Sequence, residues 1–189
     1  MRTVTLSGSL RESVGKKDAR RLRAQGLVPC VLYGGKEQKH FFTQEKQFKD
    51  IVYTDKPCFV ELMINGEKHL AILQEVQFHP VSDHIIHADF YEFSDKKPIK
   101  MHIPVVVKGN SPGVMKGGKL NVKYRTIPVK ALPSKMPEEI VIDISHLDVG
   151  GKIRVKDIAS PDYTLLIPEN NIVVAVLMSR DVLENEQNQ

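Results

Sequence analysis

Two groups of side chains in this sequence have types and spacings that could do chemistry. The first is a run of cations in residues 11–35, RESVGKKDARRLRAQGLVPCVLYGG, where six Lys and Arg residues stand against Glu12 and Asp18. Cations gathered on one face of a folded protein bind the phosphates of nucleic acids. The excess of cations favours a phosphate-binding surface over an ordinary solvated helix face.

The second group is polar and lies in the acidic second quarter of the chain. His87, Asp89 and Tyr91 alternate and so share one face of a strand, and Gln74 and Glu75 lie near the end of an earlier strand. The spacing matches no zinc pattern, and no Ser or Cys has a nucleophile's context. The remaining alternatives are a hydrogen-bonded surface pair and donors and acceptors that read RNA base edges and 2′-hydroxyls; the second fits the basic segment better.

A third segment resembles a nucleotide-binding loop. GVMKGGKL, residues 113–120, nearly fits the phosphate-loop pattern G-x-x-x-x-G-K-[ST], but Leu120 replaces the hydroxyl that should hold Mg²⁺. The motif also needs a following helix, whereas NVKYRTIPV indicates a strand. The sequence therefore argues against nucleotide hydrolysis and predicts a flexible loop that carries Lys116 and Lys119.

A short helix must position the cations. Residues 16–25 are rich in good helix formers, and Gly26 is expected to end the helix. At about 100° per residue, Lys16, Arg20 and Arg23 share one face, while apolar side chains on the neighbouring face pack inward. The helix would thus be pinned to the following strand with its cations pointing outward.

Strands must position the polar group. Apolar and β-branched runs predict five to six strands in the first half of the chain, among residues 2–10, 28–33, 39–43, 58–64, 67–78 and 84–93. Asn65-Gly66 alone separates two of them, which is typical of a type I′ hairpin turn. Thr43 is the expected N-cap of a second short helix over residues 44–53. This pattern predicts a small β-barrel.

The chain is long enough for two domains. We expect the first domain at residues 1–94, a linker at 95–98, a second domain at 99–182 and a flexible tail at 183–189. Prolines spaced through the second half argue against long helices, and its β-branched runs favour an antiparallel β domain. The predicted class is mainly β.

Charge is distributed unevenly over the chain, although its net value is only +4. Residues 1–49 carry +7 and residues 95–135 carry +9, whereas residues 50–94 and 136–189 each carry −6. This alternation favours a polyanionic partner that meets particular faces. Two cysteines without C-x-x-C spacing, and no signal peptide or membrane-spanning stretch, indicate a cytoplasmic protein.

Taken together, the motifs GKKDARRLRAQGLVPCVLYGG, LQEVQFHP and IIHADFYEF resemble those of bacterial large-subunit ribosomal proteins that bind 5S rRNA. The second half, with PVVVKGNSPGVMKGGKL and LPSKMPEEIVIDISHLDVGGKIRVKDI, resembles the long general-stress-protein (CTC) form of this family. The resemblance implies a six-stranded β-barrel with about two short helices, followed by a β-rich domain. It also implies a structural constituent of the large ribosomal subunit, without catalysis, cofactor, metal, membrane or small-molecule substrate.

The resemblance further implies which residues contact RNA. By motif position they are Arg11, Lys16, Arg20, Arg23, Tyr33, Gly34, Gln74, Glu75, His87 and Asp89. The implied partner is 5S rRNA within the large subunit, with the second domain meeting the major rRNA or neighbouring proteins. Two rival hypotheses are a metal-dependent enzyme and a stress-related RNA-binding protein that acts off the ribosome.

Overall fold

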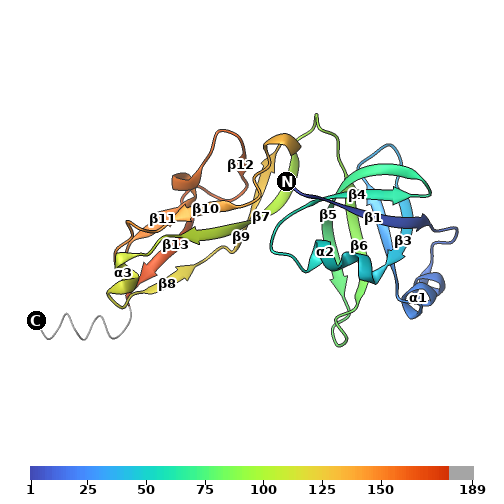
Figure 1. The fold of residues 1–189 in the computed structure, drawn as a ribbon, viewed down its shortest axis with the longest axis horizontal. Helices are drawn as coiled ribbons and strands as arrows, with labels where there is room; N and C mark the ends of the chain where they lie inside the picture. Colours follow the sequence, from blue (N-terminus) through green and yellow to red (C-terminus); the bar gives the residue numbers. More distant parts are fainter. Residues whose placement is uncertain (179–189) are drawn as a thin grey trace, which may run out of the picture. The chain divides into compact units, whose positions relative to one another are not determined.

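The computed structural model describes residues 1–178 and divides the chain into two compact units (Figure 1). The first unit is Met1–Met101 and the second is His102–Gln189. The predicted tail at residues 183–189 lies outside the described residues. The unit boundary falls a few residues beyond the expected linker, inside a strand that begins at Ile99.

The first unit is a closed six-stranded barrel, as predicted. Its strands are β1 (Thr3–Leu10), β2 (Leu27–Tyr33), β3 (Lys39–Gln44), β4 (Phe59–Ile64), β5 (Glu67–Phe78) and β6 (Ile85–Glu92). They close in the order β1-β3-β2-β6-β5-β4. The pairs β1–β4 and β2–β6 are parallel and the other pairs are antiparallel. Closure leaves no free sheet edge in this unit.

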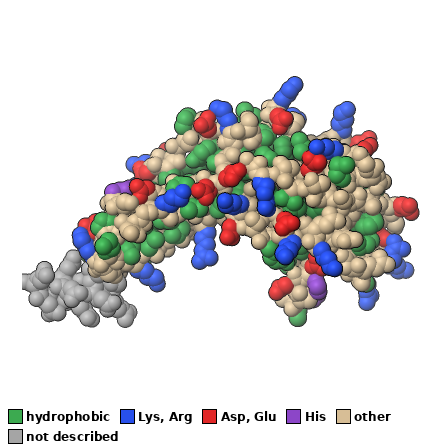
Figure 2. Space-filling view, viewed as in Figure 1, with side chains coloured by type: hydrophobic (Ala, Val, Ile, Leu, Met, Phe, Trp, Pro, Cys, Tyr) green, Lys and Arg blue, Asp and Glu red, His purple; other side chains and the backbone are tan. Residues whose placement is uncertain are grey.

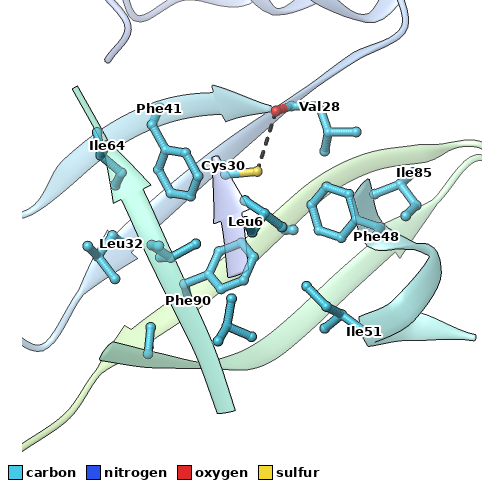
Figure 3. Close-up of a cluster of buried hydrophobic side chains, with 14 of the residues drawn as sticks. Leu6, Val28, Cys30, Leu32, Phe41, Phe48, Ile51, Ile64, Ile85 and Phe90 are labelled. Carbon is cyan, nitrogen blue, oxygen red and sulfur yellow. Dashed lines mark hydrogen bonds between the residues drawn. The ribbon is translucent and has the colours of Figure 1, made fainter. Parts of the chain in front are cut away.

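Alternating apolar side chains fill the barrel (Figure 3). In β4 every second residue is buried, because successive side chains of a strand point to opposite faces. Phe90 lies at the centre, with its ring centroid 5.7 Å from that of Phe41 and 6.2 Å from that of Phe48. Cys30 is buried in this core, and burial raises the pKa of its thiol well above the ordinary range.

The hairpin between β4 and β5 has the predicted two-residue turn. Asn65 and Gly66 have φ values of 48° and 90°. Two consecutive positive φ values define a type I′ turn, which matches the right-handed twist of the strands on either side. The turn prediction from Asn-Gly is therefore confirmed.

The helix that carries the cations is also confirmed. α1 spans Lys16–Ala24 and buries Leu22. Gly26, with φ of 72°, directs the chain into β2. Gln25 is the C-cap, so the helix ends one residue before the predicted position.

The second predicted helix differs from the structure. Residues 44–53 were expected to form one helix capped by Thr43, but a 3₁₀ turn, η1 (Glu45–Phe48), precedes a single α turn, α2 (Lys49–Val52). Thr43 lies in β3, and its hydroxyl donates to the carbonyl oxygen of Ser7 at 2.7 Å. Its side chain is buried and its hydroxyl is engaged within the barrel, so it does not cap a helix.

The second unit is β-rich, as predicted, and has two sheets. Their strands are β7 (Ile99–Lys108), β8 (Lys119–Val122), β9 (Thr126–Ala131), β10 (Ile140–Asp143), β11 (Lys152–Arg154), β12 (Thr164–Leu165) and β13 (Ile172–Leu177). One sheet has the order β10-β7-β9-β12 and the other β11-β13-β8. The remaining elements are one-turn helices, namely α3 (Pro112–Met115), η2 (Pro133–Lys135) and η3 (Val155–Ile158).

One strand pair corrects the expectation of an antiparallel second domain. β10 runs parallel to β7, with Ile140 opposite Val105. A parallel pair needs a long crossover connection, and residues 109–139 supply it through β8 and β9. The pairs β11–β13, β12–β9 and β13–β8 are antiparallel.

The segment that nearly fits the phosphate-loop pattern is held in place by hydrogen bonds of Ser111. Ser111 is buried, its hydroxyl donates to the carbonyl oxygen of Leu147, and its side chain accepts a hydrogen bond from the amide of Val114. The flexible loop expected here is therefore a capped helical turn, α3. The strand β8 follows it, so the helix that a phosphate loop requires is missing at this place.

The position of Thr43 yields a stability prediction. Thr43→Val keeps the volume of the side chain but leaves the Ser7 carbonyl without its partner, which should lower the free energy of unfolding by about 1 kcal/mol. Thr5→Val, at an exposed position of β1, should change it much less. Urea denaturation of both variants measures the difference. Equal stability of the two variants would contradict a structural role for the Thr43 hydroxyl.

Candidate nucleic-acid interface

The helix α1 is fixed to the barrel by one apolar and one polar contact. Leu22 is buried at its inner face. Next to Leu22, Nε of Arg23 donates to the carbonyl oxygen of Ile86 in β6 at 2.8 Å. The side chains of Lys16, Lys17 and Arg20 are exposed. Lys and Arg side chains gather at the end of the barrel where α1 lies (Figure 2).

The first turn of α1 is held by a carboxylate between two guanidinium groups. Asp18 accepts from Nε and Nη2 of Arg11 at 3.1 and 2.8 Å and from Nη2 of Arg21 at 2.7 Å. The hydrogen bond from Arg11 and the charges of both arginines hold the pKa of Asp18 below its usual range. The Arg11 side chain is only 6% exposed, so in this structure it is a structural cation and not a free one.

The polar side chains of β5 and β6 form one face, as the alternation predicted. Glu75 lies opposite Asp89, and Gln77 lies opposite His87. Nδ1 of His87 is 3.0 Å from Oδ1 of Asp89, and Nε2 of Gln77 donates to Glu75 at 3.3 Å. The register skips Gln74, which makes it the extra residue of a β-bulge and leaves it exposed.

The end of β2 adjoins this face through an aromatic pair. The rings of Tyr33 and Tyr91 meet edge to face, with centroids 5.8 Å apart. Burial, and then the charges of Asp89 and Glu75, raise the pKa of the Tyr33 hydroxyl. Gly34 has φ of 96°, and a Cβ there would lie 2.5 Å from the Tyr91 ring, so only glycine fits.

The structure therefore places the ten predicted residues in three settings. One strand face, called here the polar face, holds Tyr33, Gly34, Glu75, His87 and Asp89, with Gln74 at its bulge. Lys16 and Arg20 are exposed on α1. Arg11 and Arg23 attach α1 to the barrel.

Sequence reasoning missed two members of the site. Asp18 appeared only as an acid opposing the cations, yet it holds two of them. Gln77 is two residues after Glu75 and therefore points to the same face of β5, so the alternation of the strand could have identified it. Its place opposite His87 depends on the bulge, which the sequence pattern does not reveal.

Two further findings concern metal ions and membrane-spanning helices. Within residues 1–178, no three His, Cys, Asp or Glu side chains lie close enough together to hold a metal ion. In the same part of the chain, no helix has the length and apolarity that a membrane crossing requires.

A basic helix fixed beside a hydrogen-bonding strand face defines a β-barrel protein of the RNA-binding class. Comparison with known families agrees with this class. Residues 6–90 match the ribosomal L25p family, and residues 98–180 match the C-terminal domain of ribosomal protein TL5. The two matches cover the first unit and the described second unit almost completely.

Curated relatives extend the similarity over the whole chain. The large ribosomal subunit protein bL25 of Cytophaga hutchinsonii is 42% identical over 186 residues, which is 98% of this chain and 97% of the relative. The bL25 protein of Amoebophilus asiaticus is 44% identical over 180 residues, covering 95% and 92% of the two chains. The chain belongs to the bL25 family of large ribosomal subunit proteins. It is accordingly a structural constituent of the cytoplasmic ribosome and not an enzyme.

The Asp18 ion pairs predict a pH-dependent stability. Because the folded state lowers the pKa of Asp18 below 3.8, its ionised form stabilises the fold above that pH, and the contribution is lost as pH falls through the folded pKa. Asp18→Asn should therefore unfold at a lower temperature than the parent protein at pH 7, and the gap should shrink below about pH 4. Thermal unfolding by circular dichroism measures this gap.

Asp55→Asn, at an exposed site, removes the same charge and serves as the control. It should leave the unfolding temperature at pH 7 nearly unchanged. An Asp18→Asn protein as stable as the parent at pH 7 would show that the ion pairs do not hold α1.

Proposed function

We propose that this chain binds 5S rRNA in the large ribosomal subunit through α1 and the polar face. One observation carries the proposal: the hydrogen bond from Arg23 to the Ile86 carbonyl fixes α1 one residue from His87. Exposed cations and hydrogen-bonding strand residues therefore belong to one rigid surface. Membership in a family of large-subunit proteins makes rRNA the natural ligand of such a surface.

The cations of α1 supply the affinity. Lys16, Lys17 and Arg20 are exposed and form no ion pair with any of residues 1–178. Their charges are available to phosphates, which they attract without regard to base sequence. Arg11 and Arg21 are partly neutralised by Asp18, so they contribute less directly.

The polar face supplies the selectivity. Glu75 and Asp89 lie directly opposite each other, and like charges at opposed positions of a sheet are unfavourable. Carboxylates also repel phosphates, so an RNA surface containing them needs base amino groups or 2′-hydroxyls as donors. Nδ1 of His87 lies 3.0 Å from Oδ1 of Asp89, and both side chains are partly exposed, so such donors can reach them.

Two substitutions separate these roles. Arg20→Ala should weaken binding to 5S rRNA and to an unrelated RNA duplex alike, because it removes a phosphate contact. Asp89→Ala should cost about 1–3 kcal/mol on 5S rRNA only, by analogy with base-edge contacts in DNA. Binding to the duplex should stay level or rise, since a repulsive charge is gone. Filter binding at fixed salt measures both affinities.

Folding is the confounder for Asp89, because its partner His87 is partly buried. Thermal unfolding of Asp89→Ala is therefore measured beside binding, and Asp55→Ala serves as a charge-matched control away from the polar face. If Asp89→Ala is as stable as the parent and discriminates between the two RNAs equally well, the polar face does not read the groove.

Salt dependence tests the cations as a group. Three free cations on α1 predict that log affinity for 5S rRNA falls with log salt with a slope of about −2 to −3. Arg20→Ala should bring the slope closer to zero by about one. Titrations at several KCl concentrations measure it, and a slope near zero would rule out phosphate binding by α1.

A further inference from the structure

The turn of residues 34–38 joins β2 to β3 and lies against the last two residues of β6. A Cβ on Gly34 would lie 2.5 Å from the ring of Tyr91. A Cβ on Gly35 would overlap Oε2 of Glu92. Two glycines therefore let the backbone of the turn come close to a ring and to a carboxylate.

One histidine connects the two ends of this turn. Nδ1 of His69 lies 2.8 Å from Oε1 of Glu92, whose carboxylate lies against Gly35. Nε2 of the same ring lies 3.2 Å from Nζ of Lys39, the first residue after the turn, which also pairs with Glu67. An ammonium group only donates, so the Nε2 atom that faces it accepts. The proton of the neutral imidazole is then on Nδ1, from which it is donated to Glu92.

We call Lys39, His69 and Glu92 the His69 network. Each of the three lies two residues from a fully buried residue of its strand, so all three point to the core side of the barrel. Their side chains are only 22%, 13% and 25% exposed. Apolar side chains in place of a buried ion pair are often equally stabilising or more so. The network is therefore better explained by the geometry that it imposes than by stability.

A cavity makes this geometry dependent on hydrogen bonds. The cavity has a volume of about 580 Å³, and every residue that lines it belongs to the first unit. Gly34, Gly35 and the three residues of the His69 network are among these residues. Close packing normally holds a backbone in place, and open space beside the turn removes that support on this side. The His69 network supplies the support instead.

We propose that His69 and Glu92 are positioning residues for the RNA-binding surface, which hold the turn and thereby keep Tyr33 in its place on the polar face. Tyr33 directly precedes Gly34 in the chain. Its partner in the register of β6 is Tyr91, whose ring lies against Gly34, so a shift of the turn displaces both tyrosines. The inference rests on the 5S rRNA proposal and adds two residues that act through the turn.

Two substitutions of His69 test this positioning in the free protein. His69→Leu removes both hydrogen bonds, whereas His69→Asn places an amide donor near the former position of Nδ1 and keeps the bond to Glu92. The NMR order parameters of the Gly34 and Gly35 amides in the full chain should fall in His69→Leu and stay at the parent values in His69→Asn. His102→Leu, at an exposed site of the second unit, is the control. Unchanged order parameters in His69→Leu would overturn the proposal.

Binding of 5S rRNA tests the consequence for function. His69→Leu should weaken it about tenfold, the order expected from a lost hydrogen bond to a charged group, while His69→Asn and His102→Leu should bind like the parent. Filter binding at fixed salt measures the affinities, and thermal unfolding shows whether each variant folds. Glu92→Ala removes the carboxylate itself and gives the same test should His69→Leu fail to fold. An equal loss of affinity in His69→Asn and His69→Leu would overturn the proposal.

Combined substitutions show whether His69 acts through the turn. In a Tyr33→Ala protein, His69→Leu should cause little further loss, because both changes disable the same contact. In an Arg20→Ala protein the two losses should multiply, because Arg20 acts from α1. Multiplying losses with Tyr33→Ala would overturn the proposal. A His69→Leu protein that binds like the parent, beside a weakened Arg20→Ala protein, would overturn this inference alone. Full binding by both would instead contradict the 5S rRNA proposal.

Discussion

The surface of the first unit depends on one carboxylate held between two guanidinium groups. Asp18 draws Arg11 and Arg21 together, and so fixes the first turn of a helix that is too short to be stable alone. Three of the six local cations therefore support the structure, because Arg23 also holds the helix through the Ile86 carbonyl. Lys16, Lys17 and Arg20 remain exposed. A count of cations in the sequence includes both the structural cations and the exposed ones, and only the fold distinguishes them.

The second unit also holds some of its cations in ion pairs. Its ion pairs take up lysines near loops and turns, such as Lys116 and Lys135. Net charge is thus a poor guide to this protein. Acidic residues of the last quarter pair with particular lysines of this unit, so the total of +4 does not show that cations of the first unit remain exposed on α1.

Local signals predicted most of the fold. The Asn65-Gly66 turn, the end of α1 near Gly26 and the six barrel strands all follow from neighbouring residues, and the structure agrees. The errors all involve partners distant in sequence. Thr43 looked like a cap because the Ser7 carbonyl that it binds is 36 residues away. The parallel pairing of β7 with β10 likewise depends on a contact between residues that are far apart in the chain.

The polar face shows how the core and the site constrain each other. Leu73 and Val76 both pack against the barrel core, yet they are three positions apart, whereas inward positions of a regular strand are an even number apart. The bulge at Gln74 resolves this conflict by absorbing one residue. The bulge also determines the face of β5 to which the next side chains point, so that Glu75 and Gln77 face outward beside Asp89 and His87. Without the bulge, the same apolar spacing would turn Glu75 into the core, where an unpaired carboxylate is unfavourable. The core packing of Leu73 and Val76 therefore determines which side chains the strand can offer to RNA.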